Sequence, residues 1–456
     1  MSVRQILIGR DTVRSGKKNF KLLICGNINL PPPMGGLARR IINHSKVLCN
    51  MGVDIHLLSI FHKEKIDLSE VPFKIHYLLD VKAKETKKSY IPIFLTTLHK
   101  QLFFALRHPI FTLKVTSHIL KMIIKGCFTI GWFILSILYI KKIVELVEKE
   151  SIDIICTYYA FEPSFLAIKA AKFCNKPIVI ETFAETIFMK DKPEDTNKAE
   201  IYVPLFKYIF NNVNCVIAPS QHCLNGAKQY IKRQKILAKV IISGIDLDRL
   251  LINVDKEEQK KVLGYKNNKI VLFVNRLDWT KGPQYIIQAA PAVLDEIPNV
   301  IFIFIGRDAG AKVHLQKIIE QKNLKNHVIF MGTLPDEELK KYYAASDVLV
   351  FPSTTKRECM GMSMKEAMAS GTPVIAFDAG GASEAIEYGV SGYVVKVGDI
   401  NALAQTIIKI LSNDKLRREM SNFARRRAFN LFDKNKTGKE LYNTLIYVLK
   451  KYNQQY

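Results

Sequence analysis

The sequence is poor in acidic residues. Lys and Arg together number 67 and Asp and Glu only 42, which gives a formal net charge of +25. A positive surplus of this size predicts an anionic partner, which can be a nucleic acid, anionic lipid head groups or a phosphorylated substrate. We expect no nucleic-acid partner, because the sequence contains no known reader motif and its basic segments interleave with aliphatic residues.

Patterns that would indicate metal sites, disulfides or secretion are also missing. The eight cysteines are scattered, without a Cys-x-x-Cys pair and without metal-ligand spacing. This predicts a reduced, cytoplasmic protein without structural zinc. The apolar run near the N-terminus is too short for a signal peptide and carries charge on both sides. We find no low-complexity tract and no repeat of about 20 to 50 residues.

The chain is long and apolar enough for two or three domains, with 456 residues of which 48% are apolar. Apolar runs alternate with glycine-containing loops and helical segments, which is the βαβ pattern of a doubly wound parallel sheet. Because the runs are nearly continuous, we expect sheets covered on both faces. The expected strands lie at 21–26, 53–60, 152–158, 177–182, 215–220, 269–276, 299–306, 327–332, 347–353, 373–377 and 392–397.

This pattern predicts an α/β protein with two Rossmann-like domains that face each other across a cleft. We place the first domain at 1–250 and the second at 251–430, with a polar stretch at their boundary. A basic helical segment at 431–456 could pack back on the first domain. Open parallel sheets bind ligands at the carboxyl ends of their strands, so the cleft is the expected site.

Two glutamates stand close together in this acid-poor chain, Glu358 and Glu366, on either side of Gly361. The segment between them reads as a strand-to-helix loop and the start of a helix at Met362 and Ser363. A helix start presents free N–H groups and favours a phosphate, whereas a carboxylate suits vicinal sugar hydroxyls. The pattern therefore predicts a nucleotide-sugar site, with one Glu on the transferred sugar and the other on the ribose. The alternative is a capped helix with Glu366 on a solvated face.

Two cations follow the first strand of the second half. Arg276 and Lys281 lie five residues apart in VNRLDWTKG, at the strand edge expected to face the cleft. Such a pair suits a diphosphate, whose charge it would neutralise. Surface Arg and Lys are common, so an ordinary solvated pair is the alternative.

These motifs together resemble the retaining glycosyltransferases of family 4, which have the two-domain GT-B fold. The resemblance extends over residues 21 to 430 and is densest from 270 to 398. It includes Glu358 and Glu366 in ECMGMSMKEAMASGTPVI, the Arg276 and Lys281 pair, SGIDLDRL at 243–250 and MGGLARR at 34–40. It also includes GVSGYVVKVGD and a Gly-Gly-x-x-Glu turn made of Gly380, Gly381 and Glu384.

The resemblance implies transfer of a sugar, with retention, from a nucleoside diphosphate donor to a glycan or lipid-linked acceptor. The pathway would build a surface polysaccharide or glycolipid, with no metal ion and no cofactor besides the donor. The implied catalytic residues are Glu358, Arg276 and Lys281. The implied donor-binding residues are Glu366, Gly361, Met362, Ser363, Gly35, Gly36, Gly380, Gly381 and Glu384. Retention without a clear nucleophile implies attack on the face that the diphosphate leaves, with a phosphate oxygen taking the acceptor proton.

The chain departs from the family pattern at two places. Many relatives have Glu-Gly-Phe-Gly, where this chain has Glu358-Cys359-Met360-Gly361, and a family His is replaced by Ala184. Two alternatives keep the fold but change the activity. One is a nucleotide-sugar epimerase or a phosphorylase, and the other is a non-catalytic partner that binds a nucleotide-sugar.

A basic, apolar segment interrupts the first half. Residues 81–142 contain eleven Lys and Arg and one acid, Glu85, and 126–140 form a continuous apolar stretch. Fifteen helical residues rise about 22 Å, less than the ~30 Å of a bilayer core, so we do not expect a membrane span. A basic helix with an apolar side predicts attachment of residues 90–140 to an anionic membrane surface, at the inner face of the cell membrane. The alternative is a pair of core helices with a solvated lysine face.

Overall fold

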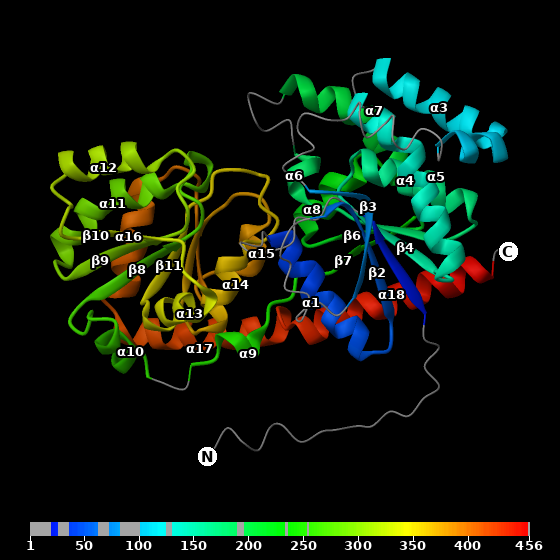
Figure 1. Ribbon diagram of the computed structural model, residues 1–456. Coiled ribbons are helices and arrows are strands. Elements are labelled where there is room, and N and C mark those ends of the chain that lie inside the picture. The colour runs from blue at the N-terminus through cyan, green and yellow to red at the C-terminus, as the bar shows by residue number, and fades with distance from the viewer. Residues whose placement is uncertain are drawn as a thin grey trace.

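The computed structural model describes residues 20–25, 36–62, 73–82, 101–124, 130–188, 196–232, 236–252 and 255–454. Two parallel α/β domains stand side by side, and this confirms the predicted fold class (Figure 1). The elements of each domain follow the alternation of apolar runs and helical segments along the sequence.

The first domain has a seven-stranded sheet in the order β3-β2-β1-β4-β5-β6-β7, with every described pairing parallel. Successive strands are added on one side of β1 up to β3 and on its other side from β4 onward. The point between β1 and β4 is therefore the switch point of the sheet, which is the usual position of a ligand crevice. The strands are β1 Lys21–Cys25, β2 Asp54–His62, β3 Lys74–Lys82, β4 Ile154–Tyr158, β5 Ile178–Glu181, β6 Cys215–Ala218 and β7 Leu237–Val240.

Helices cover both faces of this sheet and carry the crossovers between its strands. The central strands β4, β5 and β6 are buried along their whole length, as their apolar sequences require. The helices are α1 Gly36–Asn50, α3 Pro109–Ile124, α4 Ile130–Lys149, α5 Glu162–Phe173, α6 Ala184–Ile187, α7 Thr196–Asn211 and α8 Gln221–Lys228. The short helix α9 Leu247–Leu250 follows this domain along the chain.

The second domain has a six-stranded parallel sheet in the order β10-β9-β8-β11-β12-β13. Its strands are β8 Lys269–Val274, β9 Val300–Ile305, β10 Val328–Gly332, β11 Val348–Phe351, β12 Val374–Phe377 and β13 Gly392–Val395. Its helices are α10 Lys256–Val262, α11 Pro283–Glu296, α12 Lys312–Gln321, α13 Asp336–Ala345, α14 Met362–Ala369, α15 Ala382–Ala385, α16 Ile400–Leu411 and α17 Asp414–Leu431.

The chain crosses between the domains twice, and the two crossings lie side by side. Ile245, before α9, bridges to Asp433, and its N–H donates to the Phe432 carbonyl at 2.7 Å. Leu247 and Leu250 of α9 pack in the core of the second domain. By its packing, the second domain therefore begins before residue 250.

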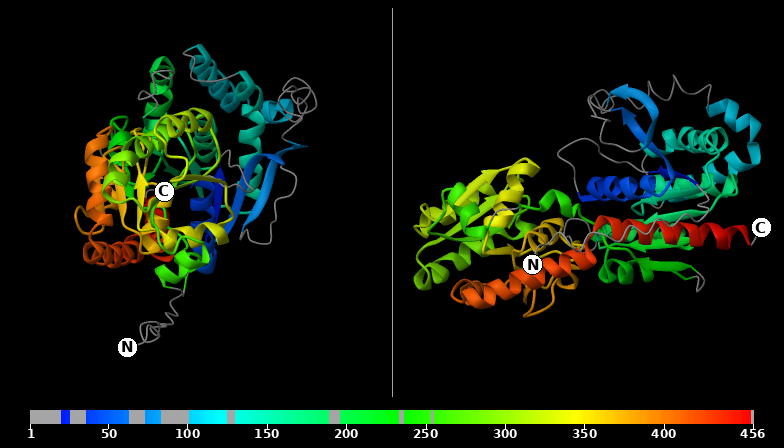
Figure 2. Two further views of the ribbon diagram at one scale, coloured as in Figure 1. Left: turned by 90° about the vertical axis from the view of Figure 1, so that its left-hand side faces the viewer. Right: turned by 90° about the horizontal axis from the view of Figure 1, so that it is seen from below.

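The last helix, α18 Lys434–Asn453, returns along the first domain (Figures 1 and 2). Its Leu441 and Leu445 are buried in the same apolar cluster as Ile41 and Leu48 of α1. Gly438 lies where α18 approaches α1, and there is no room for a side chain at this position. The C-terminal helix thus ties the two domains together.

The basic segment divides into a buried part and a surface part. In α4, Tyr139, Ile140 and Ile143 are fully buried, because this helix packs against α5 in the core of the first domain. The prediction of a surface helix reaching residue 140 is therefore wrong for this stretch. Residues 83–100 and 125–129 of the segment lie outside the described part of the chain. None of the described helices combines the length and apolar character needed to cross a membrane.

Candidate active site

A cavity of about 910 Å³ lies between the two domains, and both contribute to its wall. The structure brings eight of the predicted site residues together there. They are Gly36, Arg276, Lys281, Glu358, Gly361, Met362, Ser363 and Glu366. Gly35 lies outside the described residues, whereas Gly380, Gly381 and Glu384 are described but do not line the cavity.

The start of helix α14 forms one wall of the cavity. No side chain caps this helix end, and its first turn contains no acid. Gly361 precedes it closely against β11, where a Cβ atom would lie 2.6 Å from the Phe351 ring. The first-turn amides can therefore bind an anion in the cavity, and the helix dipole favours one.

The two predicted cations follow strand β8. Arg276 is half exposed, and its Nη2 lies 3.3 Å from Asp278 Oδ2. Lys281 ends the short 3-10 turn Trp279–Lys281, and Gly282 follows it at φ 75°. A Cβ at Gly282 would lie 1.9 Å from the Pro352 carbonyl oxygen, so this approach requires glycine.

Glu358 lies between these cations and the helix start. Its Oε1 is ion-paired with Lys281 Nζ and accepts a hydrogen bond from Ser353 Oγ at 3.1 Å. The Gly380–Gly381 turn supports the loop from behind, because Gly381 N–H donates to the Glu358 carbonyl at 2.9 Å. A Cβ at Gly381 would lie 1.8 Å from the Cys359 carbonyl oxygen. These two glycines therefore hold the backbone of the Glu358 loop.

Glu384 points toward the first domain. Its two carboxylate oxygens accept hydrogen bonds from the N–H groups of Gln221 and His222, both at 2.7 Å. These amides form the first turn of α8, where a carboxylate satisfies free donors. The structure thus places Glu384 at the domain interface beside the cavity.

Glu366 is buried within α14, with 4% of its surface exposed, so it does not lie on a solvated face. Its carboxylate accepts hydrogen bonds from Arg249 Nη2 at 2.8 Å, from Tyr343 OH at 3.0 Å and from Arg39 Nη1 at 3.3 Å. Burial, followed by the charge of Glu366, raises the pKa of Tyr343 well above its ordinary value. The phenol therefore remains a hydrogen-bond donor at neutral pH.

Asp336 joins the same group of charges. It pairs with Arg39 Nη2 at 2.7 Å and also with Arg249. Burial alone would raise its pKa, but the hydrogen bond and the charge of Arg39, with Arg249, lower it. Since Arg39 belongs to α1 of the first domain, it links the domains across the cleft. These contacts could not be predicted from local sequence patterns, because Arg39 and Glu366 are 327 residues apart.

Known proteins resemble this chain in sequence and in fold. Residues 254–427, which form nearly all of the second domain, match the family described as "Glycosyl transferases group 1". The second domain is a group 1 glycosyltransferase domain.

Several curated relatives align with part of this chain. Spore coat protein SA of Bacillus subtilis is 33% identical over 183 residues, which are 39% of this chain and 48% of that protein. The chain thus spans about half the length of such relatives. N-acetyl-alpha-D-glucosaminyl L-malate synthase of Bacillus anthracis is 24% identical over 67% of this chain and 77% of that protein.

Solved structures show that the two domains together have the GT-B fold. HepE of Anabaena, crystallised with UDP and glucose, superposes with a TM-score of 0.67 at 21% identity, over 94% of this chain and 99% of that one. A glycosyltransferase of Rickettsia africae gives a TM-score of 0.68 at 19% identity, over 95% of this chain and 100% of that one. Both likenesses cover the two domains.

Two residues depart from the pattern of the family that the sequence resembles. They are Ala184 in the first domain and Cys359 in the second, and they are in contact with each other. The backbone N–H of Ala184 lies 3.2 Å from Cys359 Sγ. Ala184 is completely buried, and Cys359 lines the cavity. A hydrogen bond with the Cys223 thiol, together with burial, raises the pKa of Cys359 well above its ordinary value. A neutral thiol therefore occupies this corner.

A buried ion pair supports the first-domain side of the cavity. Arg40 Nε donates to Glu181 Oε2 at 2.6 Å, and its Nη1 donates to Ser243 Oγ at 2.8 Å. Tyr158 OH donates to the other Glu181 oxygen at 3.4 Å, so it is a supporting residue. Tyr159, in contrast, lines the cavity directly.

Proposed function

We propose that this protein is a retaining glycosyltransferase. It moves a sugar from a nucleoside diphosphate sugar to a glycan or lipid-linked acceptor in the synthesis of a surface polysaccharide or glycolipid. The observation that carries the proposal is the shared cavity of an uncapped helix start, two cations and two glutamates. Each group matches one part of a nucleoside diphosphate sugar.

The diphosphate would lie at the start of α14, with Arg276 and Lys281 on its other side. These groups are fixed before the reaction, so they stabilise the charge that develops on the leaving diphosphate. We therefore propose that the cations, and not a metal ion, balance this charge. A chelator such as EDTA should leave turnover unchanged.

Glu358 would bind hydroxyls of the transferred sugar and Glu366 those of the ribose. Glu358 now pairs with Lys281, and Glu366 with Arg39, Arg249 and Tyr343. Hydroxyl donors could replace part of these contacts, because a carboxylate has about four acceptor sites. The acceptor hydroxyl would attack the face from which the diphosphate leaves. The C–O bond to phosphate breaks, the new glycosidic bond forms, and a leaving-phosphate oxygen takes the proton.

The comparisons favour a uridine diphosphate donor for the first assays. HepE of Anabaena was crystallised with UDP and glucose. An Escherichia coli relative, 25% identical over 63% of this chain and 74% of that protein, is named UDP-Gal:alpha-D-GlcNAc-diphosphoundecaprenol alpha-1,3-galactosyltransferase. That name supports a lipid-linked acceptor here as well.

A donor panel against membrane extracts tests the proposal. Uridine and guanosine diphosphate sugars are supplied, and the product is characterised by mass and by anomeric configuration. One donor should give a new glycosidic bond with the configuration of the donor sugar. Glu358→Ala and Arg276→Ala should each lower kcat/KM by at least a hundredfold, equivalent to about 2.7 kcal/mol.

Matched controls make these variants informative. Glu387→Ala removes an exposed glutamate of the same domain, and Arg307→Ala removes an exposed arginine after strand β9. Both should retain nearly full activity. Wild-type turnover in Glu358→Ala or Arg276→Ala would exclude the proposal. A free epimerised donor would indicate an epimerase, and nucleotide binding without transfer or donor hydrolysis would indicate a non-catalytic partner.

We also propose that the protein attaches to an anionic membrane surface through residues 101–124. On this helical stretch an outward row of apolar side chains is more than half exposed, at spacings of three, four and seven residues. The row consists of Leu106, Ile110, Leu113, Leu120 and Ile124. Arg107, Lys114 and Lys121 are exposed beside it at seven-residue spacing. An apolar row with flanking cations fits the interface of an anionic bilayer.

Liposome flotation tests the attachment. Vesicles with anionic lipid should float the wild-type protein, whereas Leu106→Glu combined with Leu113→Glu should remain at the bottom. Val262→Glu combined with Val313→Glu is the matched control, since these two residues are 66% and 61% exposed on other helices. Failure of the wild type to float, or equal loss in the control, would contradict the attachment.

A further inference from the structure

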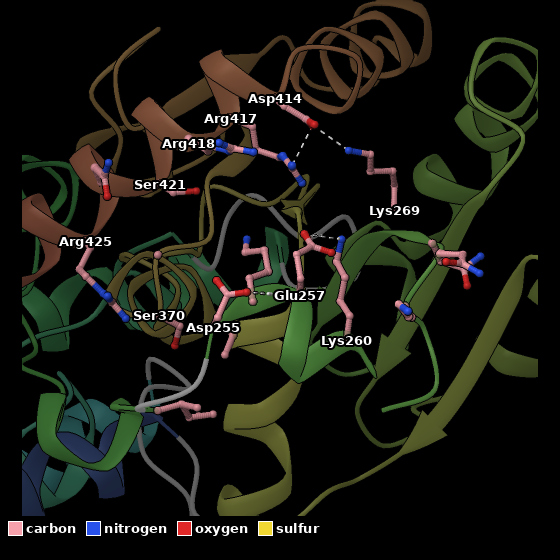
Figure 3. Close-up of a pocket in the computed structure, with 18 of the residues that line it drawn as sticks. Asp255, Glu257, Lys260, Lys269, Ser370, Asp414, Arg417, Arg418, Ser421 and Arg425 are labelled. Atoms are coloured by element: carbon pink, nitrogen blue, oxygen red, sulfur yellow. Dashed lines mark hydrogen bonds and ion pairs between the residues drawn. The ribbon is translucent and has the colours of Figure 1, made fainter. Parts of the chain in front are cut away.

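A second cavity, of about 900 Å³, lies in the second domain and shares no lining residue with the candidate active site. Figure 3 shows its walls, to which α10 and α17 contribute most of the charged side chains. The turn after α14 closes it with Ser370 and Gly371. The volume lies in the range of cavities that bind small molecules.

The lining of this cavity is strongly cationic. It contains three acids, Asp255, Glu257 and Asp414. Against them stand seven cations, namely Lys256, Lys260, Lys266, Lys269, Arg417, Arg418 and Arg425. Such a surplus on a concave wall concentrates the field and attracts anions.

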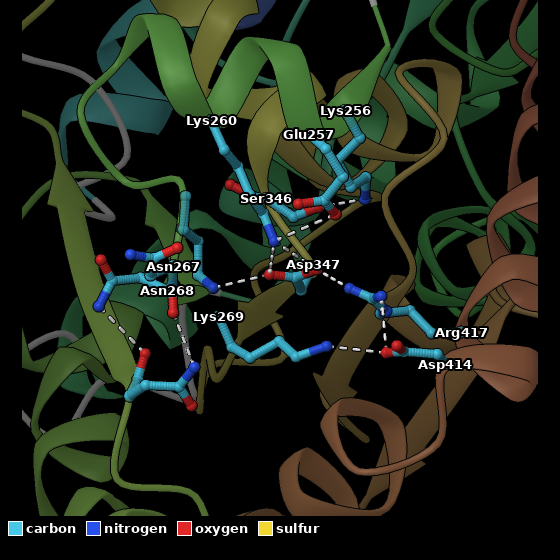
Figure 4. A network of polar contacts seen from close by, with 12 residues as sticks. Lys256, Glu257, Lys260, Asn267, Asn268, Lys269, Ser346, Asp347, Asp414 and Arg417 are labelled. Carbon is cyan, nitrogen blue, oxygen red and sulfur yellow. Dashed lines mark hydrogen bonds and ion pairs between the residues drawn. The ribbon is translucent and has the colours of Figure 1, made fainter.

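Internal ion pairs account for three of the seven cations (Figure 4). Asp347, which is fully buried behind the wall, pairs with Lys260 Nζ at 2.9 Å and with Arg417. Asp414 pairs with Lys269 Nζ at 2.7 Å and with Arg417 Nη2 at 2.8 Å. Carboxylates of the protein itself therefore neutralise these three cations.

The other four cations form no ion pair with any described residue. They are Lys256 and Lys266 on one side, and Arg418 and Arg425 on α17. Lys256 donates only to the backbone carbonyl of Ser346, and Arg425 Nε to that of Ala369 at 3.3 Å. These four charges are left for a ligand.

Two buried polar groups in the wall point to the same conclusion. Arg417 is 6% exposed and Ser370 is 7% exposed. Neither Arg417 Nε nor Ser370 Oγ has a hydrogen-bond partner among the described residues. Buried donors without partners are rare, because each costs about 1–3 kcal/mol. Both side chains line the cavity, and a small shift of either would bring its buried atom into contact with a ligand oxygen there.

The pKa of Lys256 reflects the excess of positive charge around the cavity. Burial, together with the charges of Arg417 and Lys260, lowers the pKa of Lys256 to about 7. A nearby anion would favour the protonated ammonium again.

We propose that this cavity binds a small soluble molecule carrying two linked phosphate groups. Two linked phosphate groups carry several negative charges at neutral pH. Lys266, Arg418 and Arg425 can balance them together with Lys256, which a nearby anion would keep protonated. Arg418 and Arg425 would bind one phosphate, and Lys256 and Lys266 the other. A small ligand suits the concave wall better than a flat membrane does.

The position of the cavity links the ligand to both domain connections. Ile252 and Asp255, just after the first crossing, line the cavity. Helix α17, on the opposite wall, leads directly into the second crossing and α18. A ligand that bridges α10 and α17 therefore holds the second-domain ends of both crossings together.

Isothermal titration calorimetry with inorganic pyrophosphate tests the proposal. The titration uses the full chain carrying Arg276→Ala and Lys281→Ala, which removes the cations of the other site. One pyrophosphate should bind, at least tenfold more tightly than inorganic phosphate. Arg418→Glu and Arg425→Glu should each weaken binding at least tenfold. Arg426→Glu, an exposed position on the same helix outside the lining, should change it less than twofold.

Three results would overturn the proposal. Pyrophosphate could fail to bind in the Arg276→Ala and Lys281→Ala background. Binding could fall equally in Arg426→Glu, which would show only general attraction to a basic surface. Vesicles containing phosphatidic acid could bind through Arg418 while pyrophosphate does not, which would assign the wall to a lipid head group. None of these outcomes depends on whether the protein transfers a sugar.

Discussion

At the residue scale, Glu162 carries a carboxyl group that is unfavourable to ionise. It begins α5 and is 6% exposed, and burial raises its pKa to about 7 from 4.5. Between these two pH values the folded protein retains a proton that the unfolded chain releases. The free energy of unfolding therefore falls as the pH rises from 4.5 to 7, and the full cost is present above pH 7.

Glu162→Gln should remove this cost. Urea unfolding at pH 8 should show the variant more stable than the wild type by up to about 3 kcal/mol, and at pH 4.5 the difference should vanish. Glu419→Gln, at an exposed position, should change neither value. An equal gain at both pH values would show that side-chain packing, and not ionisation, causes the effect.

The sequence predicted those site residues that lie within one loop or one strand end. Glu358 and Gly361 are three residues apart, so local spacing already places them at one helix start. Arg39 and Tyr343 contact Glu366 from other elements, and no local spacing contains that information. The Gly-Gly-x-x-Glu turn implied that Glu384 binds the donor, but the contacts of Glu384 in the structure are with the first turn of α8.

At the element scale, apolar runs predicted the buried strands, but the edge strands β3 and β7 were missed. The four residues of β7 are only half buried. Strand β3 is the longer of the two. Its sequence KIHYLLDVK mixes polar and apolar residues because Lys74–Lys82 is an edge strand that is only half buried where its burial is described. An edge strand does not need the continuous apolar run of a central strand. The apolar stretch 126–140 was predicted to lie on a membrane surface, but its end, at Tyr139 and Ile140, is buried in the core. An apolar run alone does not distinguish a core helix from a membrane-surface helix.

Helix α18 offers a test of how closely elements pack. A Cβ at Gly438 would lie 2.6 Å from the Cβ of Val47 on α1. Gly438→Ala should therefore destabilise the protein by about 1–3 kcal/mol, although alanine is the better helix former by about 1 kcal/mol. Asn443→Ala, exposed on the same helix, should be neutral or stabilising. Chemical unfolding measures both, and a stabilised Gly438→Ala variant would show that the helices are not in tight contact.

At the scale of the whole molecule, the domains meet through a few charged contacts around the cleft. Glu384 of the second domain holds the first turn of α8, and Arg39 of the first domain holds Glu366 and Asp336. The predicted cleft followed from the two repeated βαβ patterns alone. How far it is closed could not be predicted, because that depends on these contacts between distant segments.

Arg39→Met should shift the protein without ligand toward a more open arrangement. The Arg39 and Asp336 side chains are 25% and 38% exposed, so solvent screens their attraction and the pair contributes about 0.2–1 kcal/mol. Loss of this pair alone corresponds to about a fivefold change in the ratio of closed to open molecules at most, and loss of the 3.3 Å contact with Glu366 adds to it. Small-angle X-ray scattering at low salt should give a larger radius of gyration for Arg39→Met than for the wild type. High salt should bring the wild type toward the variant, because ions screen exposed pairs. Lys46→Met removes a charge from the same helix without touching the cleft lining, and it should behave as wild type. Identical scattering of Arg39→Met and the wild type at low salt would show that the contacts of α8 and α18 alone set the closure.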